Sequence, residues 1–179
     1  VEIRADVETA DLAAQEASPP AVPAPNARAE ALLDEGNAHF NVGQYALAVE
    51  RYDQAVDLEP GLVAALYDRA NARTRLGQYD EALTDYDAAI ALNPRLSLAQ
   101  KFYANLEADT GRAREGMIRL LTEATRHGND AELFAGLVHA CRYAGLFDES
   151  IAAHAEARRL DPTIATSVLQ TLMMKGDID

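Results

Sequence analysis

The spacing of apolar positions predicts helices from residue 29 onward. In "AEALLDEGNAHFNVGQYALAVERYDQAVDLEP", apolar residues recur every three or four positions on both sides of a Gly-Gln-Tyr turn. This period places them on one face of a helix. The segment therefore predicts a hairpin of two amphipathic helices.

The same pattern returns every 34 residues along the chain. One register holds only glycine, at the point where the first helix of each copy should end and a positive φ is useful. These glycines are Gly43, Gly77, Gly111 and Gly145. A second register holds residues that discourage helix continuation at the end of the second helix. These residues are Pro60, Pro94, Gly128 and Pro162.

A hairpin of this length cannot bury its apolar face alone, so neighbouring copies should stack on one another. We therefore predict an all-α fold, an α-solenoid of stacked helical hairpins that forms one domain over residues 28–179. A further helix over about 165–175 should follow the hairpins, either as a cap or as the start of a fifth copy. The four predicted units are residues 29–62, 63–96, 97–130 and 131–164.

The third unit departs from the pattern of the first two. Gly116, Leu120 and Glu123 stand where those units have alanine, tyrosine and a second alanine. We expect both of its helices to form but to pack irregularly. The unit is either a degenerate repeat between better ones or a bend with a functional use.

Residues 1–27 differ in composition from the rest of the chain. An acidic, alanine-rich stretch precedes "SPPAVPAPN", in which four prolines lie within seven residues and favour extended backbone. We predict a tail or semi-rigid linker that ends before the first hairpin.

These repeated residues resemble the tetratricopeptide repeat family. The second unit matches the first, with Ala70 in place of the glycine. The resemblance implies a right-handed superhelix whose first helices line a concave groove, and a scaffold that binds a peptide or helical segment of a partner protein there. In the first unit, the residues at the family's spacing are Leu32, Gly36, Ala48, Tyr52, Ala55 and Pro60.

Helical spacing within the first helices selects the residues that should face this groove. Asn37, Asn71 and Asn105 share one register, and an amide that both donates and accepts could hold the backbone of an extended peptide. The alternative is that these amides bond local backbone or water. The full predicted set is Leu33, Asn37, Phe40, Tyr67, Asn71, Thr74, Lys101, Asn105, Ala135, His139 and Arg142.

Some members of the family bind the C-terminal carboxylate of chaperones through a clamp of lysine, arginine and asparagine side chains. Asn37 matches one clamp position. We therefore predict that this chain does not bind chaperone tails, because the other clamp positions hold Leu33, Asp68, Leu98 and Phe102.

The charge of the chain narrows the choice of partner. Sixteen basic and 29 acidic residues give a formal net charge of −13, which disfavours nucleic acid and anionic lipid and favours a neutral or basic protein partner. No apolar run approaches the roughly 20 residues of a membrane-spanning helix, so we expect no membrane insertion. We expect a cytoplasmic protein. Because the chain begins with Val1 rather than methionine, an earlier targeting sequence, and with it a periplasmic location, stays open.

The sequence lends little support to an enzyme. It holds no Gly-rich phosphate loop, metal-ligand spacing or nucleophile motif. His139 and Cys141 are two residues apart on one predicted helix and should diverge, and Cys141 should lie in the core. We expect no catalysis, no metal site and no cofactor.

The alternative function is self-association, or packing against another domain of a larger catalytic or regulatory bacterial protein. A homo-oligomer would be one form of this alternative. The end of the chain that would carry it holds Leu169, Leu172, Met173 and Met174.

Overall fold

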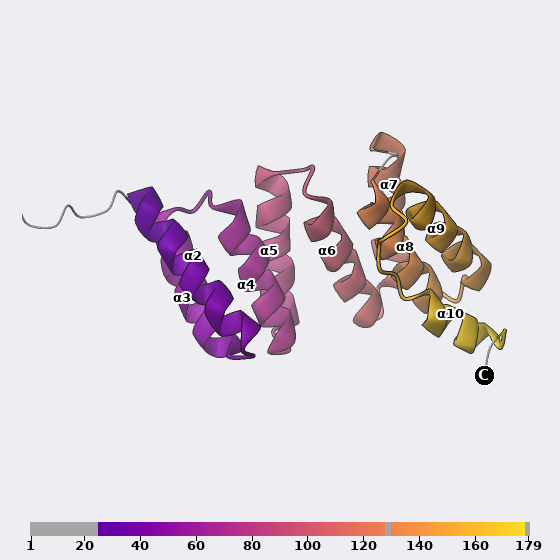
Figure 1. Cartoon of the computed structure of the whole chain (residues 1–179), viewed down its shortest axis with the longest axis horizontal. Coiled ribbons are helices and arrows are strands. Elements are labelled where there is room, and N and C mark those ends of the chain that lie inside the picture. The colour runs from indigo at the N-terminus through magenta and orange to yellow at the C-terminus, as the bar shows by residue number, and fades with distance from the viewer. Residues whose placement is uncertain (1–24, 128–129, 178–179) are drawn as a thin grey trace, which may run out of the picture.

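The computed structural model describes residues 25–127 and 130–177, and every regular element in these residues is an α-helix (Figure 1). The helices stand in a row from α2 at one end to α10 at the other, which confirms the predicted all-α solenoid. Their bounds are α2 (Pro25–Asn41), α3 (Tyr45–Leu58), α4 (Val63–Arg75), α5 (Tyr79–Leu92), α6 (Ser97–Asp109), α7 (Ala113–Arg126), α8 (Ala131–Tyr143), α9 (Phe147–Leu160) and α10 (Val168–Lys175).

Helix α2 begins earlier than the sequence predicted. It includes residues 25–27, which the composition of the sequence places in the linker. A proline is tolerated at the first position of a helix, where its missing N–H has no partner to lose, so Pro25 does not stop α2. The rest of the predicted tail lies outside the described residues.

The repeated glycines have the backbone conformation that their register predicts. Their φ angles are 79° at Gly43, 76° at Gly77, 89° at Gly111 and 77° at Gly145. A side chain in this left-handed region would be strained. Each glycine therefore lets the chain leave the first helix of a unit and enter the second.

Small residues and tyrosines together form the core of the first two units. Ala48 is fully buried and Tyr52 is 1% exposed. Gly36 is required by this packing, because a Cβ atom there would lie 2.3 Å from Cε1 of Tyr52. The ring thus occupies the space that the missing side chain leaves on α2.

The third unit forms both predicted helices and packs differently. A Cβ atom on Gly116 would lie 2.5 Å from the carbonyl oxygen of Ala104, so α7 approaches α6 more closely than an alanine would allow. The interface between α5 and α6 is also smaller than the equivalent α3–α4 and α7–α8 interfaces. The third unit thus packs closely within its own hairpin and more loosely against the second unit.

In each of the first three units, the residue at one shared position of the second helix forms an ion pair with the first helix of the same hairpin. The charges alternate: this position holds an arginine, an aspartate and an arginine in turn, and each meets the opposite charge on the first helix. The pairs are Arg51 with Glu35, Asp85 with Arg69 and Arg73, and Arg119 with Glu107. In the fourth unit the equivalent residues are apolar: Leu137, Cys141 and Ala153.

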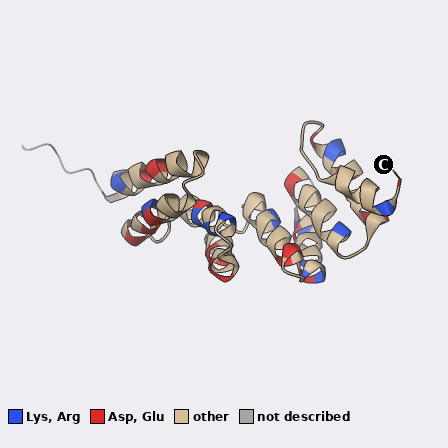
Figure 2. Cartoon of the chain, turned by 90° about the horizontal axis from the view of Figure 1, so that it is seen from below, with Lys and Arg blue, Asp and Glu red and all other residues tan. Residues whose placement is uncertain are grey.

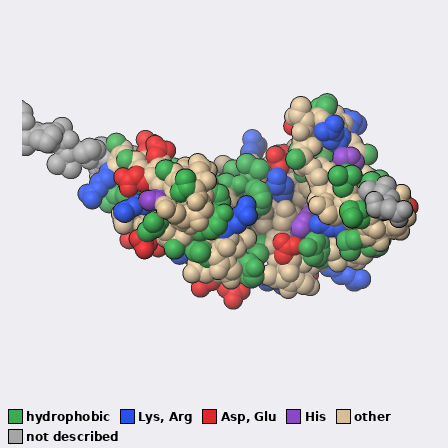
Figure 3. Space-filling view, turned by 60° about the horizontal axis from the view of Figure 1, so that its bottom comes forward, with side chains coloured by type: hydrophobic (Ala, Val, Ile, Leu, Met, Phe, Trp, Pro, Cys, Tyr) green, Lys and Arg blue, Asp and Glu red, His purple; other side chains and the backbone are tan. Residues whose placement is uncertain are grey.

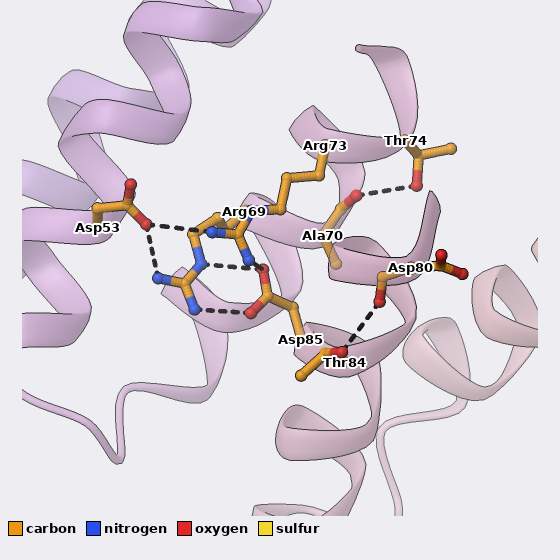
Figure 4. Close-up of polar contacts among 8 residues, drawn as sticks. All are labelled: Asp53, Arg69, Ala70, Arg73, Thr74, Asp80, Thr84 and Asp85. Carbon is orange, nitrogen blue, oxygen red and sulfur yellow. Dashed lines mark hydrogen bonds and ion pairs between the residues drawn. The ribbon is translucent and has the colours of Figure 1, made fainter. Parts of the chain in front are cut away.

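The pair in the second unit extends into a network across three helices (Figure 4). Asp85 is 3% exposed and accepts from Nη2 and Nε of Arg69, at 2.6 and 2.9 Å, and from Nη1 of Arg73 at 2.7 Å. Nη1 of Arg69 also lies 2.7 Å from Asp53 on α3. Burial alone would lower the pKa of Arg69, but its bonds to Asp85 and Asp53 raise it. The network thus ties the first unit to the second.

Replacing Asp85 with alanine should lower the free energy of unfolding by about 3–5 kcal/mol, because Arg69 and Arg73 would lose their buried counter-ion. Urea denaturation measures this change. Glu156→Ala is the control, since its pair with Arg159 lies on the surface and should matter little. Equal small losses in both variants would show that the network does not hold the hairpins together.

Candidate functional site

The first helices of the four units line two adjoining cavities. One of about 470 Å³ takes residues from α2, α4, α6 and α8, with Tyr86 of α5. The other, of about 290 Å³, takes residues from α6 and α8, from the segment leading into α10 and from α10 itself. Phe102, Asn105 and His139 line both cavities. The two cavities therefore form one continuous surface, which we call the groove.

The structure brings most of the predicted residues to this groove. Four predicted residues do not line either cavity: Leu33, Asn37, Tyr67 and Arg142. The seven that do are Phe40, Asn71, Thr74, Lys101, Asn105, Ala135 and His139.

The residues that do not line the groove pack within the fold instead. Leu33 contacts the cluster of Ala48, Tyr52 and Ala72. The ring of Tyr67 lies between Tyr86 and Phe102, with centroid distances of 6.1 and 6.2 Å. Arg142 does not line the groove, although the sequence predicts that it should. Its side chain is buried, and its guanidinium bonds the carbonyl of Ser167 and the ring of His139.

The asparagine register has a structural role in the first two units. The hydroxyl of Tyr52 donates to Oδ1 of Asn37 at 2.7 Å, and that of Tyr86 donates to Oδ1 of Asn71 at 2.6 Å. Each bond joins the two helices of one hairpin. It also fixes the amide so that its NH₂ group remains to donate elsewhere. The sequence alone suggested local backbone or water as the partner of these amides, whereas their oxygens accept from tyrosine hydroxyls.

The third unit has the asparagine without its tyrosine. Leu120 occupies the tyrosine register and is fully buried. Oδ1 of Asn105 is buried and has no hydrogen-bond partner among residues 25–127 and 130–177. An unpaired buried acceptor costs about 1–3 kcal/mol. Asn105 therefore differs from Asn37 and Asn71, although the three share one register.

His139 holds the asparagine register in the fourth unit and joins that unit to its neighbours. Arg142 can only donate, so Nδ1 of His139 accepts from its Nη2 at 3.0 Å, and Nε2 carries the proton that it donates to Asp109 at 2.8 Å. Nη1 of Arg142 donates to the carbonyl of Ser167 at 2.9 Å. Burial lowers the pKa of His139, against the opposing effect of Asp109, so the ring is held neutral.

Asp68 adds a carboxyl group to the face of α4. Asp68 occupies the same repeat position in the second unit as Phe102 does in the third. Burial raises the pKa of Asp68 to about 6, and a hydrogen bond from Asn71 opposes the rise. Tyr52, Tyr67 and Tyr86 lie near enough for this carboxylate to raise their pKa values. The group is a half-buried acceptor for which no arginine or lysine among the described residues provides a counter-ion.

Sequence reasoning missed several residues that line the groove. Arg75 and Asp109 each lie one helical turn after an asparagine of the shared register, and this spacing was the available signal. The sequence marks Phe102 only as a mismatch to the chaperone clamp, yet Phe102 lines both cavities. The residues from the segment before α10, Thr166 and Ser167, could not be placed without the path of the chain.

The groove lies on a protein surface of mixed character. Acidic and basic residues are interspersed along the helices (Figure 2), and hydrophobic groups lie among both on the face seen in Figure 3. Within the described residues, no group of His, Cys, Asp and Glu is arranged to hold a metal ion. None of the described helices is long and apolar enough to cross a membrane.

Comparison with known families gives a match over more than half of the chain. The family model described as tetratricopeptide repeat matches residues 33–97 and 67–132. No curated protein sequence matches the chain at a significant level.

Several solved structures are similar in fold at low sequence identity. TTC0263, a TPR protein of Thermus thermophilus, is 19% identical with a TM-score of 0.71, over 83% of each chain. MamA of Desulfovibrio magneticus RS-1 is 19% identical with a TM-score of 0.64, over 84% of this chain and 86% of its own. YrrB, a TPR protein with an unusual peptide-binding site, is 18% identical with a TM-score of 0.57, over 83% and 78%.

Leucine at position 37 and leucine at position 105 should have different effects on stability. Asn37→Leu should cost about 1–3 kcal/mol, because the buried hydroxyl of Tyr52 loses its acceptor. Asn105→Leu should leave the free energy of unfolding unchanged or raise it, because it removes an unpaired oxygen. Urea denaturation of both variants tests this difference, and an equal loss at the two positions would contradict it.

Proposed function

The chain belongs to the tetratricopeptide repeat family, and we propose that it binds an extended peptide segment of a partner protein in the groove. Members of this family are generally non-catalytic scaffolds for protein interaction. We likewise propose no catalytic role for these residues.

The continuity of the groove carries this proposal. Its lining passes from Phe40 on α2 through Asn71 on α4 and Asn105 on α6 to His139 on α8. A single bound side chain needs only one cavity, whereas a surface that crosses four helices suits a chain of several residues. The peptide-binding site described for YrrB supports this assignment by analogy.

The chemistry of the lining indicates what the segment should contain. Phe102 is 36% exposed and offers an apolar contact, and the amide of Asn71 is held in place by its bonds to Tyr86 and Asp68. Asp68 lies beside this amide, just outside the lining of the two cavities, as a carboxylate without a counter-ion among the described residues. We therefore propose a segment that combines apolar side chains with a lysine or arginine, which agrees with the net charge of −13.

The proposal is tested with peptides selected from a displayed library of random sequences. Phe102→Ala and Asn105→Ala should each weaken binding of the selected peptide about tenfold, because both residues lie where the two cavities meet. Calorimetric titration measures the affinity.

Two control variants, matched to the groove variants in side-chain type, change residues on α5 and just after it. Tyr79→Ala and Asn93→Ala remove the same kinds of side chain at exposed positions outside the groove and should leave the affinity unchanged. Selected peptides that bind the groove variants as tightly as the unaltered protein would overturn the proposal.

Self-association is a second candidate function, favoured by the exposed apolar face of α10. Leu169, Met173 and Met174 are 63%, 59% and 61% exposed. Leu172 is half-buried and less available. Clustered exposed apolar residues often mark an interface.

The mass of the protein in solution tests this candidate. Self-association predicts a mass that rises with concentration and falls to that of the monomer in Leu169→Asp and Met173→Asp, whose side chains are exposed. Light scattering after size-exclusion chromatography measures it. A constant monomer mass would remove the candidate.

A further inference from the structure

A second cleft takes its lining from α5, α6, α7 and α8 and from the connections between them. It consists of two adjoining cavities of about 630 and 370 Å³. Pro94, Gln100, Glu123 and His127 line both. No residue of the groove belongs to this lining, so this outer cleft is a separate site.

Two polar residues of the outer cleft stand at registers that are apolar in every other unit. Gln100 occupies the register of Leu32, Leu66 and Phe134. Glu123 occupies the register of three alanines, Ala55, Ala89 and Ala157. The third unit thus departs from the repeat at the same place where the outer cleft opens.

The amide oxygen of Gln100 lacks a donor. Gln100 is 5% exposed, and its Oε1 is buried without a hydrogen-bond partner in the described part of the chain. The other units fill this register with an aliphatic or aromatic side chain that has no such need. A buried acceptor without a donor lowers stability, so its presence requires an explanation.

Glu123 supplies a second acceptor at the junction of the two cavities. Its side chain is 14% exposed, and its Oε1 accepts from Nη1 of Arg126 at 2.9 Å. Arg126 itself is 64% exposed, so it approaches this carboxylate from the solvent side. The other carboxylate oxygen has no donor among the described residues.

The larger cavity has apolar as well as charged side chains in its lining. Ile90 and Ile118 line the larger cavity, and Ile118 is 60% exposed. Arg119 also lines it, but its guanidinium lies 3.9 Å from the centre of the Tyr103 ring and its Nε lies 3.3 Å from Glu107. Arg119 is therefore already engaged, whereas Oε1 of Gln100 and the second carboxylate oxygen of Glu123 have no donor in the described part of the chain.

We propose that the outer cleft binds an arginine side chain of a partner protein. The aliphatic part of that side chain lies between Ile90 and Ile118, and its guanidinium donates to Oε1 of Gln100 and to Glu123. A planar group with five donors can satisfy two acceptors at once. Arg95 and Arg126 also line the cleft, and the occupant is cationic because the two groups without a donor are acceptors and the chain carries a net charge of −13.

The test uses N-acetyl-arginine N-methylamide as the probe, with the citrulline analogue as a neutral control of similar shape. Titration is followed by NMR at the side-chain amide of Gln100 and the methyl groups of Ile118. The arginine probe should give saturable shifts at these positions, and the citrulline probe should bind about tenfold more weakly or not at all.

Gln100→Leu separates binding from folding. This variant should bind the arginine probe about tenfold more weakly, and it should melt at a higher temperature because it removes a buried oxygen that lacks a donor. Ile118→Ser, at an exposed position, should weaken binding with little change in melting temperature. Phe102→Ala in the groove should leave the shifts unchanged, so this result is independent of the proposed peptide binding.

Three results would overturn the proposal. Equal shifts from the arginine and citrulline probes would show that the cleft does not select a cation. An absence of shifts up to the solubility limit of the probe would show that the cleft holds only water. Unchanged binding in Gln100→Leu would show that its oxygen is not an acceptor for the ligand.

Discussion

The hydrogen bond from a buried tyrosine to an asparagine one helix away links the fold of this chain to its binding surface. Tyr52 and Tyr86 are each 1% exposed, and their hydroxyls reach Asn37 and Asn71. The ring fills the space between the two helices of a hairpin, and its hydroxyl orients an amide on the first helix. One contact thus fixes the hairpin and determines which hydrogen-bonding groups the asparagine has left to offer a ligand.

The third unit lacks this bond between tyrosine and asparagine, and residues of the third unit line both proposed sites. Leu120 cannot bond Asn105, Gln100 replaces an apolar residue, and Glu123 replaces an alanine. Each change leaves a polar group buried or half-buried and costs stability that the regular units keep. Such departures from a local rule are typical of functional positions.

The period of 34 residues was sufficient to predict the solenoid, its turn glycines and most of the groove. Helical spacing predicts that Asn71, Asn105 and His139 share a face, and the three line one cavity. Arg142 was misplaced, because its contact with the carbonyl of Ser167 depends on the path of the chain before α10. The ion pairs within the hairpins could not be predicted from the repeat, because the charge at the shared position of the second helices changes sign from unit to unit. A comparison of residue identities therefore finds no repeated residue there.

The central claim is that a peptide lies along the first helices of the four units. It is tested most directly by NMR mapping of the backbone amides perturbed when the tightest selected peptide binds. The account predicts perturbations that run from Phe40 through Asn71 and Asn105 to His139. Perturbations confined to the second helices α3, α5, α7 and α9, or to α10, would contradict it.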